Sequence, residues 1–245
     1  SHAEDAHAKS RGGKVAGKEF TPWGVKERLS LEKTAIGFYL SGHLFDEVER
    51  EVRQFVRRSI ADLSDSREPQ LLAGIVGDYR VINGQRGKLA LFKLDDKSGS
   101  IDARAEEGLI HQHRNLLKDD EFIVVMAKAM PDRFSGGLQL NITQIWDLPT
   151  ARCRFGKFLR VAAGGGKAPD VRRLLAESPP QVEPTEHGDL LRGLPVRLLI
   201  ERRSEKGGVM AQIQLGDEAQ FFPSDAALAS WIAQADEGRA MVVYE

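Results

Sequence analysis

The sequence predicts an α+β protein of several domains, with a helical segment first, a small five-stranded β-barrel next and a small α+β unit last. Three observations support this. Apolar residues recur at helical spacing between residues 26 and 63. Runs of strand length, interrupted once by a helical stretch, occupy residues 71–146. Residues 155–245 then follow the order strand, helix, strand, strand, helix, strand, which favours a two-layer unit.

The N-terminal part divides into a linker and a helical segment. Residues 1–20 are polar, small and charged, so we expect them to form a disordered linker. Residues 21–66 are expected to hold two helices, at about 26–40 and 45–63. Acidic residues precede arginines in the second helix, an order that suits a helix dipole, and these arginines are expected to form a solvated face.

The barrel is expected over residues 70–148. Its first three strands are apolar-rich runs separated by an Asn/Gly break and an Asp/Ser/Gly break, which is typical of an antiparallel meander. The predicted elements are strands at 71–82, 88–94 and 100–105, a helix at 107–117, and strands at 121–130 and 138–146. Three strands, a helix and two strands is the order of an oligonucleotide/oligosaccharide-binding (OB) fold.

An OB fold binds its ligand across strands 2 and 3, between the loops that join strands 1–2 and 4–5. Basic side chains in these loops can hold phosphates, and an aromatic ring can stack on a base. The predicted nucleic-acid-binding residues are Arg80, Arg86 and Lys88 near the first loop and Arg133 and Phe134 in the second. The meander by itself leaves open that the first loop is an ordinary charged turn.

Residues 154–245 are predicted to form a compact α+β domain, for which a ferredoxin-like order is one form. The expected elements are strands at 155–161, 194–202, 209–215 and 241–244, helices at 169–178 and about 224–235, and a polar loop at 179–193. The run AAGGGK is similar to a phosphate loop, but Ala168 follows its lysine where Ser or Thr is required, so a plain loop is expected.

Composition excludes several classes of protein. The chain has 35 Lys and Arg against 36 Asp and Glu, which excludes a strongly basic nucleic-acid binder. Cys153 is the only cysteine, which excludes an internal disulfide and a cysteine metal cluster. No run approaches the roughly 20 apolar residues that span a bilayer, and the N-terminal residues are not a signal peptide, so a cytoplasmic protein is expected. No catalytic residues, metal ligands or cofactor loop are recognisable, so none is predicted for this chain.

Several motifs occur in the order found in one known family. They are Trp23, Glu27, Leu29, Glu32-Lys33 and the run from Gly37 to His43; then Ala73-Gly74, Phe92, Leu94-Asp95-Asp96 and Ser98-Gly99; then the run from Asp132 to Leu138; and finally Pro195-Val196-Arg197 and Phe222-Pro223-Ser224-Asp225. Through them, residues 21–245 resemble the C-terminal part of bacterial DNA polymerase III alpha subunits, the replicative C-family polymerases. One departure is Leu44, which stands where most members have proline after Gly-His.

The resemblance implies a C-terminal fragment that binds single-stranded template DNA through its OB fold and docks to the clamp-loader tau subunit. The family's clamp-binding motif, its palm domain with Mg²⁺ and its catalytic aspartates would lie upstream, so this fragment alone should not polymerise DNA. The parent would be a DNA-directed DNA polymerase that also contacts the sliding clamp. Candidates for tau contact, if they are exposed, are Phe221, Phe222 and Trp231, but large residues on an amphipathic helix are more often part of the core.

Two other classes stay open. One is a stand-alone module that binds single-stranded DNA or tRNA, although it would not require the flanking helical and C-terminal regions. The other is an enzyme in its own right, for which the sequence offers no catalytic constellation.

Overall fold

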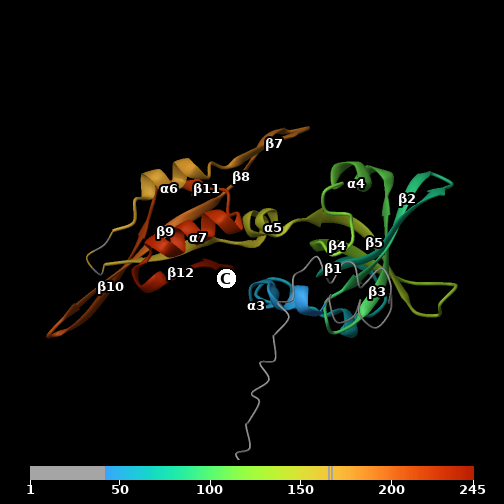
Figure 1. The fold of residues 1–245 in the computed structure, drawn as a ribbon, viewed down its shortest axis with the longest axis horizontal. Coiled ribbons are helices and arrows are strands. Elements are labelled where there is room, and N and C mark those ends of the chain that lie inside the picture. Colours follow the sequence, from blue (N-terminus) through green and yellow to red (C-terminus); the bar gives the residue numbers. More distant parts are fainter. Residues whose placement is uncertain (1–41, 165, 167) are drawn as a thin grey trace, which may run out of the picture. The chain divides into compact units, whose positions relative to one another are not determined.

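The structure is a computed structural model that describes residues 42–164, 166 and 168–245 (Figure 1). The predictions for residues 1–20 and for a helix at 26–40 lie outside the described residues. The residues from 42 onward belong to one compact unit, which contains a closed barrel and an open sheet.

The barrel has the predicted OB order. Its strands follow the closed path β1-β2-β3-β5-β4, in which only β3 and β5 are parallel. The elements are β1 (Ser66–Gly84), β2 (Gly87–Asp95), β3 (Ser100–Glu106), α4 (Glu107–Gln112), β4 (Phe122–Pro131) and β5 (Leu138–Trp146). All five predicted strands are confirmed, and the predicted helix is present but ends at Gln112.

Side chains along the barrel strands alternate between the interior and the surface. Along β3, Ile101, Ala103 and Ala105 face the barrel interior and are buried, while the residues between them are exposed. Gly74 allows β1 and β2 to come close, since a Cβ atom there would lie 2.8 Å from the carbonyl oxygen of Asp95. The small residues therefore let a narrow barrel close around its larger apolar side chains.

The predicted long helix at 45–63 is wrong. Residues 42–46 and α3 (Glu49–Val52) are helical, after which the chain turns and forms a 3-10 helix at Ile60–Asp62. Arg53 is not part of a solvated face, because its guanidinium donates to the carbonyl oxygen of Arg58 at 3.2 Å and reaches Asp96 in the barrel at 3.0 Å. The turn also places Val56, which is fully buried, in the core.

The second sheet follows the order β10-β9-β6-β12, with a short strand β11 beside β9. Its elements are α5 (Leu148–Phe155), β6 (Phe158–Ala163), α6 (Val171–Glu177), β7 (Gln181–Thr185), β8 (Gly188–Arg192), β9 (Leu194–Ser204), β10 (Gly207–Gln214), β11 (Gln220–Phe221), α7 (Asp225–Gln234) and β12 (Ala240–Val243). In a ferredoxin-like split βαβ unit another strand separates the two parallel strands. Here β6 and β9 pair directly, so the ferredoxin-like order is wrong.

The remaining predictions for this region are partly confirmed. The expected polar loop at 179–193 is mostly the hairpin β7–β8, which pairs with no other strand among the described residues. Ser224 caps α7, because its hydroxyl accepts a hydrogen bond from the Ala227 N–H at 3.1 Å. The loop after β6 requires glycine at Gly164, which has φ 141° and whose Cβ would lie 2.8 Å from the Glu201 carbonyl oxygen.

Candidate nucleic-acid interface

An open groove of about 620 Å³ lies on the outside of the barrel. It is bounded by the exposed faces of β1, β2, β3 and β5 and by the β4–β5 loop. Its lining residues include Asp78, Arg80, Leu91, Lys93, Asp102, Arg104, Met130, Asp132, Arg133, Phe134, Gln139 and Asn141. This is the surface on which an OB fold binds its ligand.

Strand register brings the basic residues of the groove together. Arg80 lies opposite Leu91, and Leu91 lies opposite Arg104, so the two arginines flank one apolar side chain. Arg104 in turn faces Asn141 across the parallel pair β3–β5. The groove therefore presents guanidinium groups beside an apolar and an amide side chain on one sheet face.

Four cations of the groove have no electrostatic partner in the part of the chain that the structure describes. Arg80, Lys93, Arg104 and Arg133 are exposed and form no ion pair or side-chain hydrogen bond with other described residues. Unpaired cations around one groove are available to bind phosphates. Three aspartates share the lining, which reduces the net positive charge of this surface.

Asp132 shapes the loop that carries Arg133 and Phe134. Its carboxylate accepts a hydrogen bond from the Phe134 N–H at 3.1 Å, and its own N–H donates to the Gly137 carbonyl at 2.8 Å. The hydrogen bonds from Phe134 and from Ser135 lower the pKa of Asp132, which keeps its carboxylate charged. The loop is a preformed turn with Phe134 fully exposed at 100%.

The structure brings together only some of the predicted site residues. Arg80, Arg133 and Phe134 line the groove, whereas Arg86 and Lys88 lie at the exposed tip of the β1–β2 hairpin and do not line it. Sequence reasoning missed Lys93 and Arg104. Alternation gave a signal for both, because each is the charged residue between inward-facing neighbours on a predicted strand.

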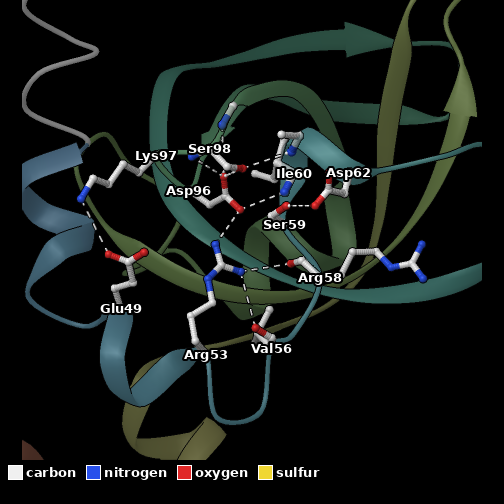
Figure 2. A network of polar contacts seen from close by, with 12 residues as sticks. Glu49, Arg53, Val56, Arg58, Ser59, Ile60, Asp62, Asp96, Lys97 and Ser98 are labelled. Atoms are coloured by element: carbon white, nitrogen blue, oxygen red, sulfur yellow. Dashed lines mark hydrogen bonds and ion pairs between the residues drawn. The ribbon is translucent and has the colours of Figure 1, made fainter.

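The acidic turn between β2 and β3 is a structural feature. Asp96 is only 2% exposed and accepts hydrogen bonds from the Ile60 N–H at 2.9 Å, from Arg53 at 3.0 Å and from the Ser98 N–H at 3.1 Å (Figure 2). Lys97 points away from this network and pairs with Asp46, whose hydrogen bond raises the pKa of the lysine. The Asp-Asp-Lys-Ser-Gly motif thus ties the segment before β1 to the barrel.

Two of the candidates for tau contact are not on the surface. Phe221 and Trp231 are 0% exposed and pack against each other with ring centroids 5.5 Å apart, so both are core residues, the alternative that the sequence left open. Apolar spacing on a helix does not reveal which residues a sheet will cover. Phe222 is partly exposed.

The described residues contain neither a candidate metal site nor a helix able to span a membrane. Within residues 42–245, leaving out 165 and 167, no group of three His, Cys, Asp or Glu side chains could hold a metal ion. In the same residues no helix has the length and apolar character needed to cross a membrane.

Comparison with known proteins identifies related sequences. No protein-family model matches the chain. The DNA polymerase III subunit alpha of Pseudomonas fluorescens is 39% identical over 145 residues, which cover 59% of this chain and 12% of that protein. The same subunit of Vibrio cholerae is 28% identical over 209 residues, which cover 84% of this chain and 17% of that protein. The chain therefore spans less than a fifth of the length of these relatives.

Solved structures with similar parts were also found. The second OB-fold domain of replication protein A from Methanococcus maripaludis is 16% identical, with 37% of this chain and 93% of that chain covered and a TM-score of 0.31. A replication protein A heterotrimer bound to single-stranded DNA is 18% identical, with 63% and 36% covered and a TM-score of 0.31. The OB assignment rests on the strand order of the barrel itself. By sequence, as its motifs predicted, the chain is similar to a C-terminal fragment of the DNA polymerase III alpha subunit.

Proposed function

We propose that this chain is the part of a replicative DNA polymerase that guides single-stranded template DNA and docks to the clamp-loader tau subunit. In this proposal the groove of the barrel holds the DNA strand, and the C-terminal sheet provides the docking surface for tau. The observation that carries the first part is the set of four unpaired cations around the groove, next to the exposed ring of Phe134.

The chemistry of the groove suits a single strand. Arg80, Lys93, Arg104 and Arg133 can each contact a phosphate, and Phe134 can stack on a base that a duplex would hide. The rest of the lining is three aspartates, the amides of Gln139 and Asn141 and apolar side chains, so base readout would rest on a few side chains, while the four cations contact phosphates whatever the sequence. Binding should therefore depend strongly on salt and weakly on sequence.

The parent protein's activity also belongs to the proposal. Similarity to DNA polymerase III alpha supports a DNA-directed DNA polymerase that works in the cytoplasm. The catalytic aspartates, their Mg²⁺ and the sliding-clamp motif would be supplied by other parts of that polymerase. This chain would then contribute template handling and assembly, without catalysis of its own.

Titration of a fluorescent oligothymidylate tests the groove. Replacing Arg80 and Arg104 by alanine should weaken binding and reduce the slope of log affinity against log salt by about 1.4, or about 0.7 for each lost phosphate contact. The matched control is Arg172→Ala with Arg173→Ala on the surface of α6, which should bind as the wild type does.

The same titration distinguishes the groove from the hairpin tip. Arg86→Ala with Lys88→Ala should also weaken binding, since a strand leaving the groove can follow the β1–β2 loop. Wild-type affinity in the Arg80 and Arg104 variant would contradict the groove as the binding site. A loss confined to the Arg86 and Lys88 variant would move the site to the hairpin.

A further inference from the structure

None of the helices that the structure describes covers one face of the C-terminal sheet. Leu159, Val161 and Val196 point to the side where α6 and α7 pack and are buried in one core with Leu174 and Trp231. Because side chains alternate along a strand, the residues between them point to the opposite side. We call that side the open face, and its members include Phe158, Arg160, Arg197, Leu199, Glu201, Met210 and Met241.

Two arginines lie side by side on the open face. Arg160 on β6 and Arg197 on β9 are register partners in a parallel pair. Within the described residues neither has an acidic partner: Arg160 donates to the Met241 sulfur at 3.4 Å, and the Arg197 guanidinium lies 4.0 Å from the centre of the Phe158 ring. Like charges in direct register cost stability, so an anion between them would be stabilising.

The acidic side chain on the open face does not neutralise Arg160 and Arg197. Glu201 is the acidic residue among the described strand positions of the open face, and it is held by Arg239 through contacts of 3.1 and 3.3 Å. The other members add apolar surface, with Met210 exposed at 70% and Met241 at 50%. The open face is therefore cationic in the middle and apolar around it.

We propose that the open face docks an acidic protein segment that also carries apolar side chains. Arginine, methionine and aromatic residues without lysine are the composition of protein–protein interfaces, and methionine adapts to a partner's shape. A nucleic acid fits less well, because Arg197 already covers one face of Phe158 and two cations contact few phosphates. This inference rests on the proposed docking to tau, which would supply the acidic segment.

The experiment uses the full chain, a labelled peptide of repeated Glu-Glu-Leu-Phe units and the purified tau subunit. Replacing Arg160 and Arg197 by glutamine should weaken the binding of both probes roughly tenfold or more, as expected for the loss of close charge pairs. Arg172→Gln with Arg173→Gln, on the helical side of the same domain, is the matched control and should bind normally. Thermal unfolding verifies that each variant is folded, and lysine at both positions should retain part of the affinity.

The two probes separate the inference from the proposed function. If the peptide binds through the two arginines and tau does not bind, the open face stands and the docking to tau is wrong. If tau binds the wild type and the glutamine variant equally, docking stands and the open face is overturned. Failure of the peptide to bind the wild type, or equal binding to the glutamine variant, also overturns it.

Discussion

At the scale of single residues, Arg152 links four parts of the chain through its guanidinium group. It is only 4% exposed, and its guanidinium contacts both carboxylate oxygens of Glu51, at 2.6 and 3.0 Å, and that of Asp225 at 2.7 Å. The Tyr244 hydroxyl donates to the same Glu51 at 2.6 Å. Burial opposes the charge of Arg152, but the hydrogen bonds and charges of Glu51 and Asp225 outweigh it and raise its pKa. The cation therefore joins α3, α5, the start of α7 and the C-terminal residues.

Replacing Arg152 by glutamine should lower the free energy of unfolding by roughly 3–5 kcal/mol, because the change leaves Glu51 without its buried partner. Urea unfolding followed by circular dichroism measures this. The control is Arg154→Gln, an exposed neighbour on the same helix, which should change stability little. Equal stability of the two variants would show that the contacts of Arg152 do not stabilise the fold.

Phe134 is a residue whose replacement should affect binding alone. Its side chain is 100% exposed, so Phe134→Ala should leave the melting temperature unchanged. Loss of one base-stacking surface should weaken single-stranded DNA binding by about 1–3 kcal/mol. Phe134→Trp is the matched variant and should restore affinity. Unchanged binding of Phe134→Ala in an oligonucleotide titration would remove the ring from the site.

At the scale of elements, the β2–β3 turn positions the segment that precedes the barrel. Asp96 links residues of that segment to the turn across 43 and 36 positions of sequence, through Arg53 and the Ile60 N–H. Lys97 has φ 74°, a left-handed conformation that leaves the neighbouring N–H groups directed at the aspartates. The turn therefore acts as an anchor for the chain before β1.

Asp96→Asn should destabilise the fold by roughly 3 kcal/mol, because it leaves Arg53 without its partner and places an amide where Asp96 accepts hydrogen bonds. Asp102→Asn on the exposed face of β3 is the control and should have little effect on stability. Guanidinium unfolding curves of the two variants are the measurement. If Asp96→Asn were as stable as the control, the network in Figure 2 would contribute nothing.

At the scale of the whole molecule, His113 is influenced by charges from distant parts of the sequence. It follows α4 and is half-buried; burial lowers its pKa, and the charges of Asp147 before α5 and Glu183 on β7 only partly oppose this. The folded state therefore prefers the neutral imidazole more than the unfolded state does. By linkage, the unfolded chain binds the proton more readily, so stability is lost as the pH falls below the unfolded pKa.

The prediction is a pH dependence with a definite direction. Melting temperature should fall as the pH is lowered from about 7 through the unfolded histidine value of about 6.5. His113→Gln should show a smaller decrease over the same range, and the two proteins should converge in slope above neutral pH. His187→Gln, an exposed histidine on the β7–β8 turn, is the control. If the melting temperature of the His113 variant fell with pH as steeply as that of the wild type, His113 would not be the group responsible.

How much the sequence could predict depends on the range of the interaction. The barrel strands followed from alternation and turn residues, which are local, and the groove residues Arg80, Arg133 and Phe134 followed from the strand order. The break in the helix at 45–63 accompanies a contact between Arg53 and Asp96, which are 43 positions apart, and no local pattern reveals such a contact. The burial of Trp231 likewise depends on which side of the second sheet receives α7.

The two tryptophans of the described residues have a consequence for spectroscopy. Trp146 lies edge-on to Phe155 at 5.4 Å in the core beside the barrel, and Trp231 lies in the core of the second sheet without a hydrogen-bond acceptor for its Nε1 among the described residues. Each core thus carries an indole in apolar surroundings. In a Trp23→Phe background, Trp231→Phe leaves Trp146 as the fluorophore, and Trp146→Phe leaves Trp231. Each variant therefore reports on one core. If the two cores unfold in separate steps, the two variants will show separate changes in emission.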